Sequence, residues 1–98
     1  MQFIIKAYDG EGKLDKRMEV RPRHLEGMKI LGNKVIAAGG LLDEEGRMKG
    51  SALVMEFENR AALDAYLAAE PYVTEGVWEK IEVEPMNVVL VLGEKAGK

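Results

Sequence analysis

The sequence predicts an α+β fold in which four strands and two helices follow one another in the order β-α-β-β-α-β. Two observations predict it. Several short segments alternate apolar and polar residues, the two-residue period of a strand, whereas two longer segments repeat apolar residues every three or four positions, the period of a helix. The chain has 98 residues, 47% of them hydrophobic and 32% charged, so we expect one globular domain over residues 1–98.

The first strand and the first helix occupy the N-terminal third of the chain. Residues 2–8 are apolar and β-branched enough for a strand, and Asp9-Gly10 ends it with turn-forming residues. The pattern then becomes helical from residue 15 to residue 32, but Pro22 has no amide proton and crowds the residue before it. We therefore expect a turn and then a helix that starts near Pro22. Its apolar stripe would consist of Leu25, Met28 and Leu31, and its end would be Gly32-Asn33.

The central segments predict a hairpin and a second helix. Residues 35–42 read as a strand interrupted by Gly39-Gly40, and residues 51–57 read as the next strand after a turn at residues 43–46. Asn59 is a suitable N-cap for a helix over residues 60–69, because its side-chain oxygen can accept an amide proton of the first turn. Pro71 would close that helix.

The C-terminal segment predicts the last strand. Lysine and glutamate alternate with Ile81 and Val83, and Pro85 then marks a bend or an edge strand. The apolar run 88–92 follows, and residues 93–98 look like a frayed end.

Elements in this order usually form a ferredoxin-like fold, a four-stranded antiparallel sheet with both helices on one face. The other face of the sheet then needs cover. A chain of this size buries only about 60–65% of its unfolded surface, so an uncovered apolar face is costly. We therefore expect a homodimer.

Charge and composition exclude several classes of partner. The net charge of −3 and the scattered lysines and arginines give no basic footprint for nucleic acid. One histidine and no cysteine make a transition-metal site improbable, and the sequence has no phosphate- or dinucleotide-binding glycine motif, so we expect no cofactor. The sequence has neither a signal-peptide core nor a stretch of about 20 apolar residues, so we expect a soluble cytoplasmic protein with no membrane partner.

His24 and Glu70 are the candidate catalytic residues. His24 is the single histidine and lies at the margin of the predicted apolar stripe, where a semi-enclosed imidazole can exchange a proton near neutral pH. Glu70 lies three residues after Leu67, so it points toward the apolar side of the second helix. The alternatives are a structural histidine bonded to a backbone carbonyl and a solvated glutamate at a helix end.

Two arginines and an aromatic residue are candidates for substrate binding. Arg17 and Arg21 precede His24 by seven and three residues, and a guanidinium from either can hold an anionic group, although surface ion pairs are an equally good reading. Tyr72, like Tyr66 and Trp78, would line either a pocket or the core. Gly39-Gly40 would leave room for a ligand or mark a bulge.

Two motifs resemble the YciI-like (YCII-related) family. The stretch Lys16-Arg17-Met18-Glu19-Val20-Arg21-Pro22-Arg23-His24-Leu25 is similar to the family's arginine followed by R-P-x-H-L. The stretch Ala68-Ala69-Glu70-Pro71-Tyr72-Val73-Thr74-Glu75-Gly76-Val77-Trp78 resembles its D-P-Y/F-x-x-x-G segment. The resemblance spans roughly residues 1–90.

The resemblance implies a dimeric α/β-barrel, in which two sheets pair face to face, and a His–Asp active site. His24 takes the place of the histidine and Glu70 that of the aspartate, so this chain departs from the family pattern by one methylene group. A characterised relative in the family is a dehydrochlorinase acting on a chlorinated hydroxyhydroquinone.

Three functions compete. The leading hypothesis is a cofactor-independent lyase or isomerase-like enzyme in which His24 moves a proton, Glu70 orients the imidazole, and Arg17 or Arg21 holds an anionic or phenolic oxygen. The rival is a noncatalytic dimeric module that binds a small metabolite or assists another enzyme. A purely structural dimer, the third class, predicts no ligand-sized pocket near His24.

Overall fold

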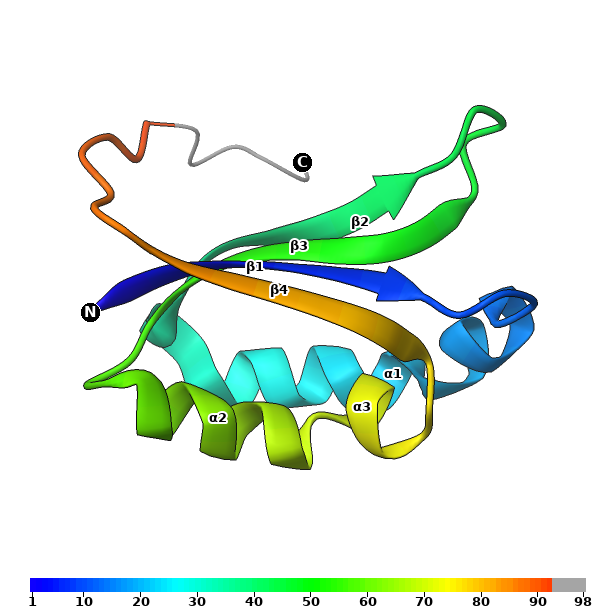
Figure 1. Cartoon of the computed structure of the whole chain (residues 1–98), viewed down its shortest axis with the longest axis horizontal. Coiled ribbons are helices and arrows are strands. Elements are labelled where there is room, and N and C mark those ends of the chain that lie inside the picture. The colour runs from blue at the N-terminus through cyan, green and yellow to red at the C-terminus, as the bar shows by residue number, and fades with distance from the viewer. Residues whose placement is uncertain (93–98) are drawn as a thin grey trace.

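The structure, a computed structural model, describes residues 1–92 and contains a four-stranded antiparallel sheet with its helices on one side (Figure 1). The strands are β1 (Gln2–Asp9), β2 (Val35–Leu42), β3 (Met48–Glu56) and β4 (Trp78–Met86). The helices are α1 (Leu14–Leu31), α2 (Arg60–Ala69) and the single turn α3 (Pro71–Thr74), and the 3₁₀ turn η1 covers Gly32–Lys34. The strand order β2-β3-β1-β4 confirms the predicted ferredoxin-like fold.

The core lies between the sheet and the helices. Alternate residues of β1, namely Phe3, Ile5 and Ala7, are at most 1% exposed, because successive side chains of a strand point to opposite faces. Across the β1–β3 ladder they face Met55, Leu53 and Ser51. The core is closed from the helix side by residues that include Val20 of α1 and Leu63 of α2. This arrangement fixes α1 over the inner strands.

The prediction that the first helix begins near Pro22 is wrong. Helix α1 runs without interruption from Leu14 to Leu31, with Pro22 inside it. Pro22 and Met18, whose carbonyl would have received the missing amide proton, both lie on the exposed side of the helix. The carbonyl of Met18 therefore faces the solvent side, where hydration can offset part of the lost hydrogen bond. The buried side chains before and after Pro22 then hold both halves against the sheet.

The predicted apolar stripe of this helix is also partly wrong. Its buried residues are Arg17, Val20 and His24, whereas Leu25 is 41% exposed. Met28 and Leu31 pack against the core as expected. Two of the three buried positions carry polar side chains, because this part of the helix lines a cavity. Gly32 ends the helix with a φ of 59°, as predicted, while no residue other than glycine has a positive φ in the described part of the chain.

The second helix confirms its prediction at both ends. It covers Arg60–Ala69, and the side-chain oxygen of Asn59 accepts a hydrogen bond of 2.9 Å from the backbone N–H of Ala62. The prediction missed the short helix α3 that follows directly. Glu70 lies between the two helices, because it ends α2 and serves as the N-cap of α3, with Pro71 in the first position. The chain therefore turns sharply at Glu70.

The C-terminal part of the chain consists of strand β4 and the residues that follow it. Strand β4 is an edge strand and contains Pro85, as predicted, but it is longer than the alternating residues 80–84 suggested. The apolar run 88–92 follows it outside any strand, and the predicted frayed end, residues 93–98, lies outside the described residues. Within residues 1–92, no helix is long and apolar enough to cross a membrane.

Candidate functional site

A cavity of about 210 Å³ lies beside helix α1 and the hairpin of β2 and β3. The polar side chains on its wall include Arg17, Arg21 and His24 from α1, which lie at intervals of three and four residues and so share one face of the helix. Gly40 of β2 and Met48 of β3 form part of the opposite wall. An engineered cavity of about 150 Å³ is large enough for benzene, so this cavity has room for a single substituted ring.

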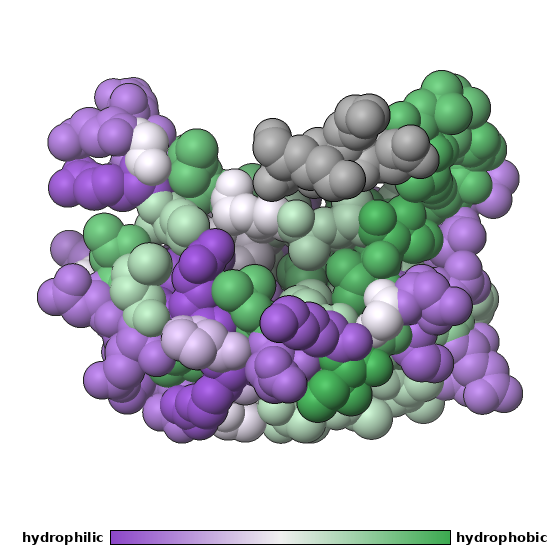
Figure 2. Space-filling model, turned by 180° about the vertical axis from the view of Figure 1, so that it is seen from behind, coloured by the Kyte–Doolittle hydropathy of each residue, from purple (hydrophilic) through white to green (hydrophobic). Residues whose placement is uncertain are grey.

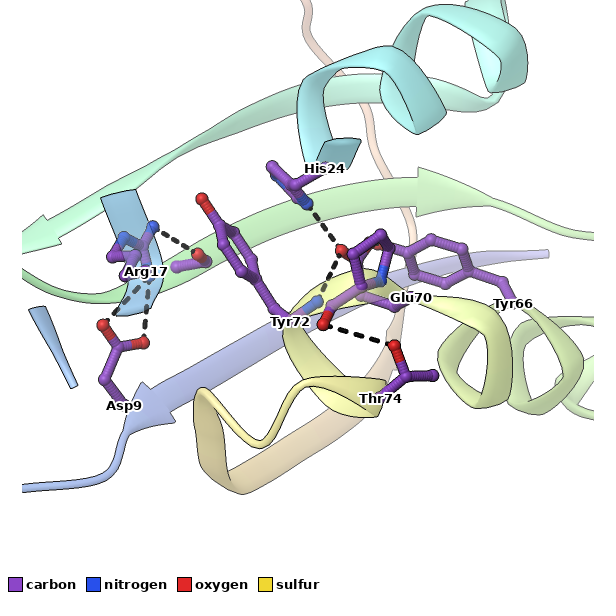
Figure 3. A network of polar contacts seen from close by, with 9 residues as sticks. Asp9, Arg17, His24, Tyr66, Glu70, Tyr72 and Thr74 are labelled. Atoms are coloured by element: carbon purple, nitrogen blue, oxygen red, sulfur yellow. Dashed lines mark hydrogen bonds and ion pairs between the residues drawn. The ribbon is translucent and has the colours of Figure 1, made fainter. Parts of the chain in front are cut away.

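His24 and Glu70 meet at this site. The Nδ1 atom of His24 lies 2.8 Å from Oε1 of Glu70, and the two residues are 7% and 2% exposed (Figure 3). A carboxylate can only accept hydrogen bonds, so the proton of a neutral imidazole is on Nδ1 and the lone pair of Nε2 is free. The structure thus brings together two residues that are 46 positions apart in the chain.

The carboxylate of Glu70 is held from several sides. Oε1 also accepts a hydrogen bond of 3.2 Å from the backbone N–H of Tyr72, which caps helix α3. Oε2 accepts a hydrogen bond of 2.6 Å from the hydroxyl of Tyr66, one helical turn earlier. Burial and the nearby Glu70 charge raise the pKa of Tyr66, so its hydroxyl remains a donor at neutral pH. Glu70 is therefore fixed as an orienting group for His24.

Tyr72 lies between the imidazole of His24 and the guanidinium of Arg17 (Figure 3). The His24 and Tyr72 rings stack with centroids 4.3 Å apart, and Cζ of Arg17 lies 4.7 Å from the centroid of the Tyr72 ring. The Tyr72 hydroxyl is buried and has no hydrogen-bond partner among the described residues. Burial raises the pKa of Tyr72 while Arg17 and Arg21 lower it, so the phenol is a free donor beside the cavity.

Arg17 is buried in an ion pair rather than exposed on the surface. Its Nη1 atom donates to the carboxylate of Asp9 at 2.9 and 3.2 Å, and its Nη2 atom donates to Oγ of Ser51 at 2.8 Å. The Nε atom is buried without a partner in the described part of the chain. Burial raises the pKa of Asp9, although the Arg17 charge opposes this. Asp9 fixes the guanidinium against the Tyr72 ring.

Arg21 differs from Arg17 because no carboxylate within residues 1–92 forms an ion pair with it. Its side chain is half-buried and lines the cavity. The two carboxylates near the site are occupied, Asp9 by Arg17 and Glu70 by His24. The charge of Arg21 is therefore available for an anionic ligand.

Sequence reasoning missed Asp9 and Ser51, and it named Tyr66 as a pocket or core residue without its hydrogen bond to Glu70. A signal for Tyr66 was present, because a residue four positions before Glu70 on the same helix is within reach of it. Asp9 and Ser51 gave no comparable signal, since the fold alone brings them to Arg17 from 8 and 34 positions away. Tyr72 lines the cavity as one of its predicted alternatives, whereas Trp78 belongs to the core.

The site contains no arrangement suited to a metal ion. Within residues 1–92, histidine, aspartate and glutamate side chains do not gather in any group of three or more that could hold one. The polar side chains that line the cavity instead carry two guanidiniums, one imidazole, one phenol and the hydroxyl of Ser51. Guanidinium groups can bind an oxyanion, and a neutral imidazole can accept a proton.

The fold and the site together define a ferredoxin-like domain with a histidine–carboxylate pair beside a small cationic cavity. The model of the YCII-related domain matches residues 1–87, and the chain belongs to this family. The chain is 33% identical to Protein YciI from Escherichia coli O6:H1, over 91% of this chain and 99% of the relative. It is 35% identical to an uncharacterized protein from Haemophilus influenzae, with the same coverage of both chains.

A solved structure extends the comparison to an enzyme. The 5-chloro-2-hydroxyhydroquinone dehydrochlorinase from Burkholderia phenoliruptrix AC1100, in complex with 2,5-dihydroxybenzoquinone, superposes with a TM-score of 0.83 at 26% sequence identity. The match covers 89% of this chain and 94% of the dehydrochlorinase. This chain is thus similar in fold over most of its length to a small-molecule enzyme.

Proposed function

We propose that this protein is a cofactor-independent enzyme that moves a proton to or from a small, hydroxylated or anionic single-ring substrate. The observation that carries the proposal is the contact of 2.8 Å between His24 Nδ1 and Glu70 Oε1 beside a cavity of about 210 Å³. It supports an imidazole whose Nε2 is free to act as general base.

The proposed mechanism assigns one role to each group. Nε2 of His24 takes a proton from the substrate, and the carboxylate of Glu70 stabilises the imidazolium that results. In an elimination, the electrons of the broken bond to hydrogen form a new π bond, and a leaving group such as chloride departs with its bonding pair. Arg17, Arg21 and the Tyr72 hydroxyl stabilise the negative charge on the substrate oxygen.

The resemblance to the dehydrochlorinase supports the class of substrate. A hydroxylated ring that has lost a proton carries its charge on oxygen, and Arg21 has no competing carboxylate in the described part of the chain. The apolar part of the wall, which includes Leu25 and Met28, suits the ring itself. We therefore use 5-chloro-2-hydroxyhydroquinone and 2,5-dihydroxybenzoquinone as probes.

The test measures chloride release from 5-chloro-2-hydroxyhydroquinone by the wild-type protein and by His24→Gln. We expect release above the uncatalysed rate with wild type and a loss of at least about 100-fold in His24→Gln, the usual contribution of a general base. Lys29→Gln, an exposed change on the same helix, is the control and should retain full activity. Equal turnover by His24→Gln and wild type would refute the proposal.

A second candidate function is a noncatalytic module that binds a small metabolite. The specific observation in its favour is Glu70, because a glutamate where the family has aspartate changes the reach of the carboxylate, and catalysis is sensitive to displacements of about 1 Å. Binding of 2,5-dihydroxybenzoquinone by calorimetry, without turnover of any chlorinated or hydroxylated ring, would favour this module.

We also propose that the protein is a homodimer whose two sheets pair through their open faces. No helix of the described residues lies on the face of the sheet opposite α1 and α2 (Figure 1). Its centre carries the half-buried apolar residues Ile4, Ala52 and Val54. A small domain gains stability by covering such a face with a second copy.

A further inference from the structure

Tyr66 makes the shortest polar contact of the site without reaching the cavity. Its hydroxyl donates a hydrogen bond of 2.6 Å to Oε2 of Glu70, and Nδ1 of His24 lies 2.8 Å from the other oxygen, Oε1 (Figure 3). His24 lines the cavity, whereas Tyr66 and Glu70 do not. Tyr66 therefore acts on the imidazole through the carboxylate that lies between them.

Tyr66 and Glu70 instead line a second cavity, of about 260 Å³, between α1 and α2. The rest of its wall is apolar and includes Leu31 and Pro71. The Tyr66 ring also stacks on Phe57, with ring centroids 5.7 Å apart, which holds the phenol in place. Among the residues that the structure describes, Tyr66 is the one hydrogen-bond donor to Oε2. This oxygen of the carboxylate thus depends on a single phenol.

A buried carboxylate in contact with an imidazole opposes the use of that imidazole as a base. Glu70 and His24 are 2% and 7% exposed, so little water screens the attraction between the carboxylate and a protonated ring. The contact therefore favours the imidazolium form. An imidazolium carries a proton on both nitrogens and has no lone pair with which to accept another. A base at this position needs groups that limit the attraction.

The positive charges on the cavity side of α1 can limit it only before a ligand binds. Arg21 lies three residues before His24 and has no carboxylate partner within residues 1–92, so an anionic ligand in the cavity cancels its charge. Arg17 lies beyond the Tyr72 ring and is already paired with Asp9. These two cations therefore do not set the proton affinity of the imidazole once an anion is bound.

The other side chains around the imidazole add little charge to its surroundings. Tyr72 of α3 and Trp78 of β4 face the ring with centroids 4.3 and 6.2 Å away, and burial raises the pKa of Tyr72, so both are neutral. Strands β2 and β3 present no titratable side chain to the cavity. Arg23 and Glu26 are exposed on α1, on whose side Figure 2 shows hydrophilic residues over the lower part of the molecule, so water screens them. The hydrogen bonds to Glu70 are then left to moderate its charge.

Tyr66 is the stronger of the two hydrogen-bond donors that hold Glu70. Its bond of 2.6 Å compares with 3.2 Å for the backbone N–H of Tyr72. A short hydrogen bond to an ionised group is about twice as strong as one between neutral groups. Burial raises the pKa of Tyr66, so the phenol keeps its proton and remains a donor. The bond draws negative charge toward Oε2 and away from the oxygen that contacts His24.

We propose that Tyr66 is a positioning residue that limits the proton affinity of His24 by holding part of the Glu70 charge, so that the imidazole is a neutral base at neutral pH. The inference rests on the function proposed above and adds the group that sets the strength of its base. A tyrosine with a purely structural role would stabilise the fold and leave the titration of the imidazole unchanged.

The test follows the His24 imidazole by NMR as the pH is varied, in the ligand-free protein, where the single histidine gives one set of ring signals. We expect the titration midpoint to rise by at least about 0.5 pH unit in Tyr66→Phe, a roughly threefold gain in proton affinity, because the carboxylate then keeps its full charge. Glu70→Gln should lower the midpoint. Adding Tyr66→Phe to Glu70→Gln should change nothing further, since the charge through which Tyr66 acts is gone.

Two further variants separate this effect from damage to the fold. Tyr8→Phe, the matched control, removes a phenol from the opposite face of the sheet and should leave the midpoint within about 0.1 pH unit of wild type. Tyr66→3-fluorotyrosine keeps the hydrogen bond and makes the phenol a stronger donor, so it should move the midpoint in the direction opposite to Tyr66→Phe. Circular dichroism checks that each variant is folded.

Chloride release from 5-chloro-2-hydroxyhydroquinone provides a second measurement. In Tyr66→Phe the acidic limb of the pH profile of kcat/KM should move to higher pH by the same amount as the NMR midpoint. KM on the alkaline plateau should change by less than about twofold, because Tyr66 does not line the cavity.

An unchanged NMR midpoint in Tyr66→Phe, or an equal rise when this change is added to Glu70→Gln, would overturn the inference, whether or not the protein releases chloride. The expected midpoints without any turnover would support the link from Tyr66 to the imidazole and count against the proposed function alone.

Discussion

Replacement of Arg17 by methionine should destabilise the protein through the carboxylate that it leaves behind. The side chains of Arg17 and Asp9 are 4% and 5% exposed, and their atoms lie 2.9 Å apart. Methionine keeps the apolar stem of the side chain but removes the charge. Asp9 then remains in the same buried position without a cation, so the change exposes the cost of burying its charge.

The expected loss at pH 7 is about 3–5 kcal/mol in the free energy of unfolding, the usual result of breaking a buried ion pair from one side. Two charges 4 Å apart at an effective dielectric constant of about 20 attract each other by about 4 kcal/mol, which agrees with this range. Arg60 and Asp64 provide the matched control. Their atoms are also 2.9 Å apart, but both side chains are more than half exposed, so Arg60→Met should cost less than about 0.5 kcal/mol.

The loss should depend on pH in a defined direction. Burial already raises the pKa of Asp9 in the folded protein, and Arg17 opposes that rise. Without Arg17 the pKa of Asp9 in the folded state rises further. The folded variant then holds its proton more tightly than the unfolded chain does, so the penalty is complete above the raised pKa and disappears below the unfolded value of about 3.9. The difference between the variant and the wild type should therefore shrink as the pH falls from 7 to 4.

Urea denaturation of the wild type, Arg17→Met, Asp9→Asn and the double variant at pH 7 and pH 4 measures these terms as a double-mutant cycle. The double variant should recover most of the free energy of unfolding that Arg17→Met loses, because neither position 9 nor position 17 then carries a buried charge. The reasoning would be refuted if Arg17→Met cost no more than Arg60→Met at pH 7, or if its cost were the same at both pH values.

Three further predictions concern single groups of the site and the sheet. Tyr66→Phe removes the 2.6 Å hydrogen bond to the carboxylate of Glu70 and should lower the free energy of unfolding by about 1.5–3 kcal/mol in urea denaturation. A decrease of less than about 0.5 kcal/mol would contradict this prediction. Gly40→Val adds a side chain on the cavity face, beside Met48, and should weaken binding of 2,5-dihydroxybenzoquinone at least about tenfold by calorimetry. Gly39→Val adds its side chain on the other face of the sheet, beside Ala52, and should leave binding unchanged. Gly50→Ala places a Cβ against the carbonyl oxygen of Ala7 with no room for it, so its thermal melt should show a loss of about 2 kcal/mol or more in the free energy of unfolding, and an unchanged melting temperature would contradict the close approach of β1 and β3.

The fold was predictable because its signals are local. The bounds of β2 and α2 agree with the prediction at both ends, since Asn59 and the turn at residues 43–46 are strong local signals. The error at Pro22 arose because a local rule was applied where tertiary packing decides. Val20 and His24, on either side of Pro22, are both buried, and the packing of both halves outweighs the cost of one proline on the solvent side.

The site was predictable only in part, and the error at Pro22 explains one gap. A helix that starts near Pro22 leaves Arg17 in a turn, where its direction is undefined and a surface ion pair is a reasonable reading. A continuous helix instead places Arg17 two turns before His24, on the face toward the sheet. Its contact with Asp9 then follows from the three-dimensional fold, which no spacing in the sequence reveals.

Glu70 joins folding and site geometry in a single side chain. One oxygen caps helix α3 through the Tyr72 N–H and also contacts His24, and the other accepts from Tyr66, so the carboxylate is a structural element of the turn between α2 and α3. The carboxylate of Glu70 is thus held by a hydrogen bond from α2 and by another from α3. The imidazole is oriented by a group that cannot move without disturbing this turn. We infer that the rigidity of the α2–α3 junction, more than the identity of the acid, sets the direction in which Nε2 of His24 faces the cavity.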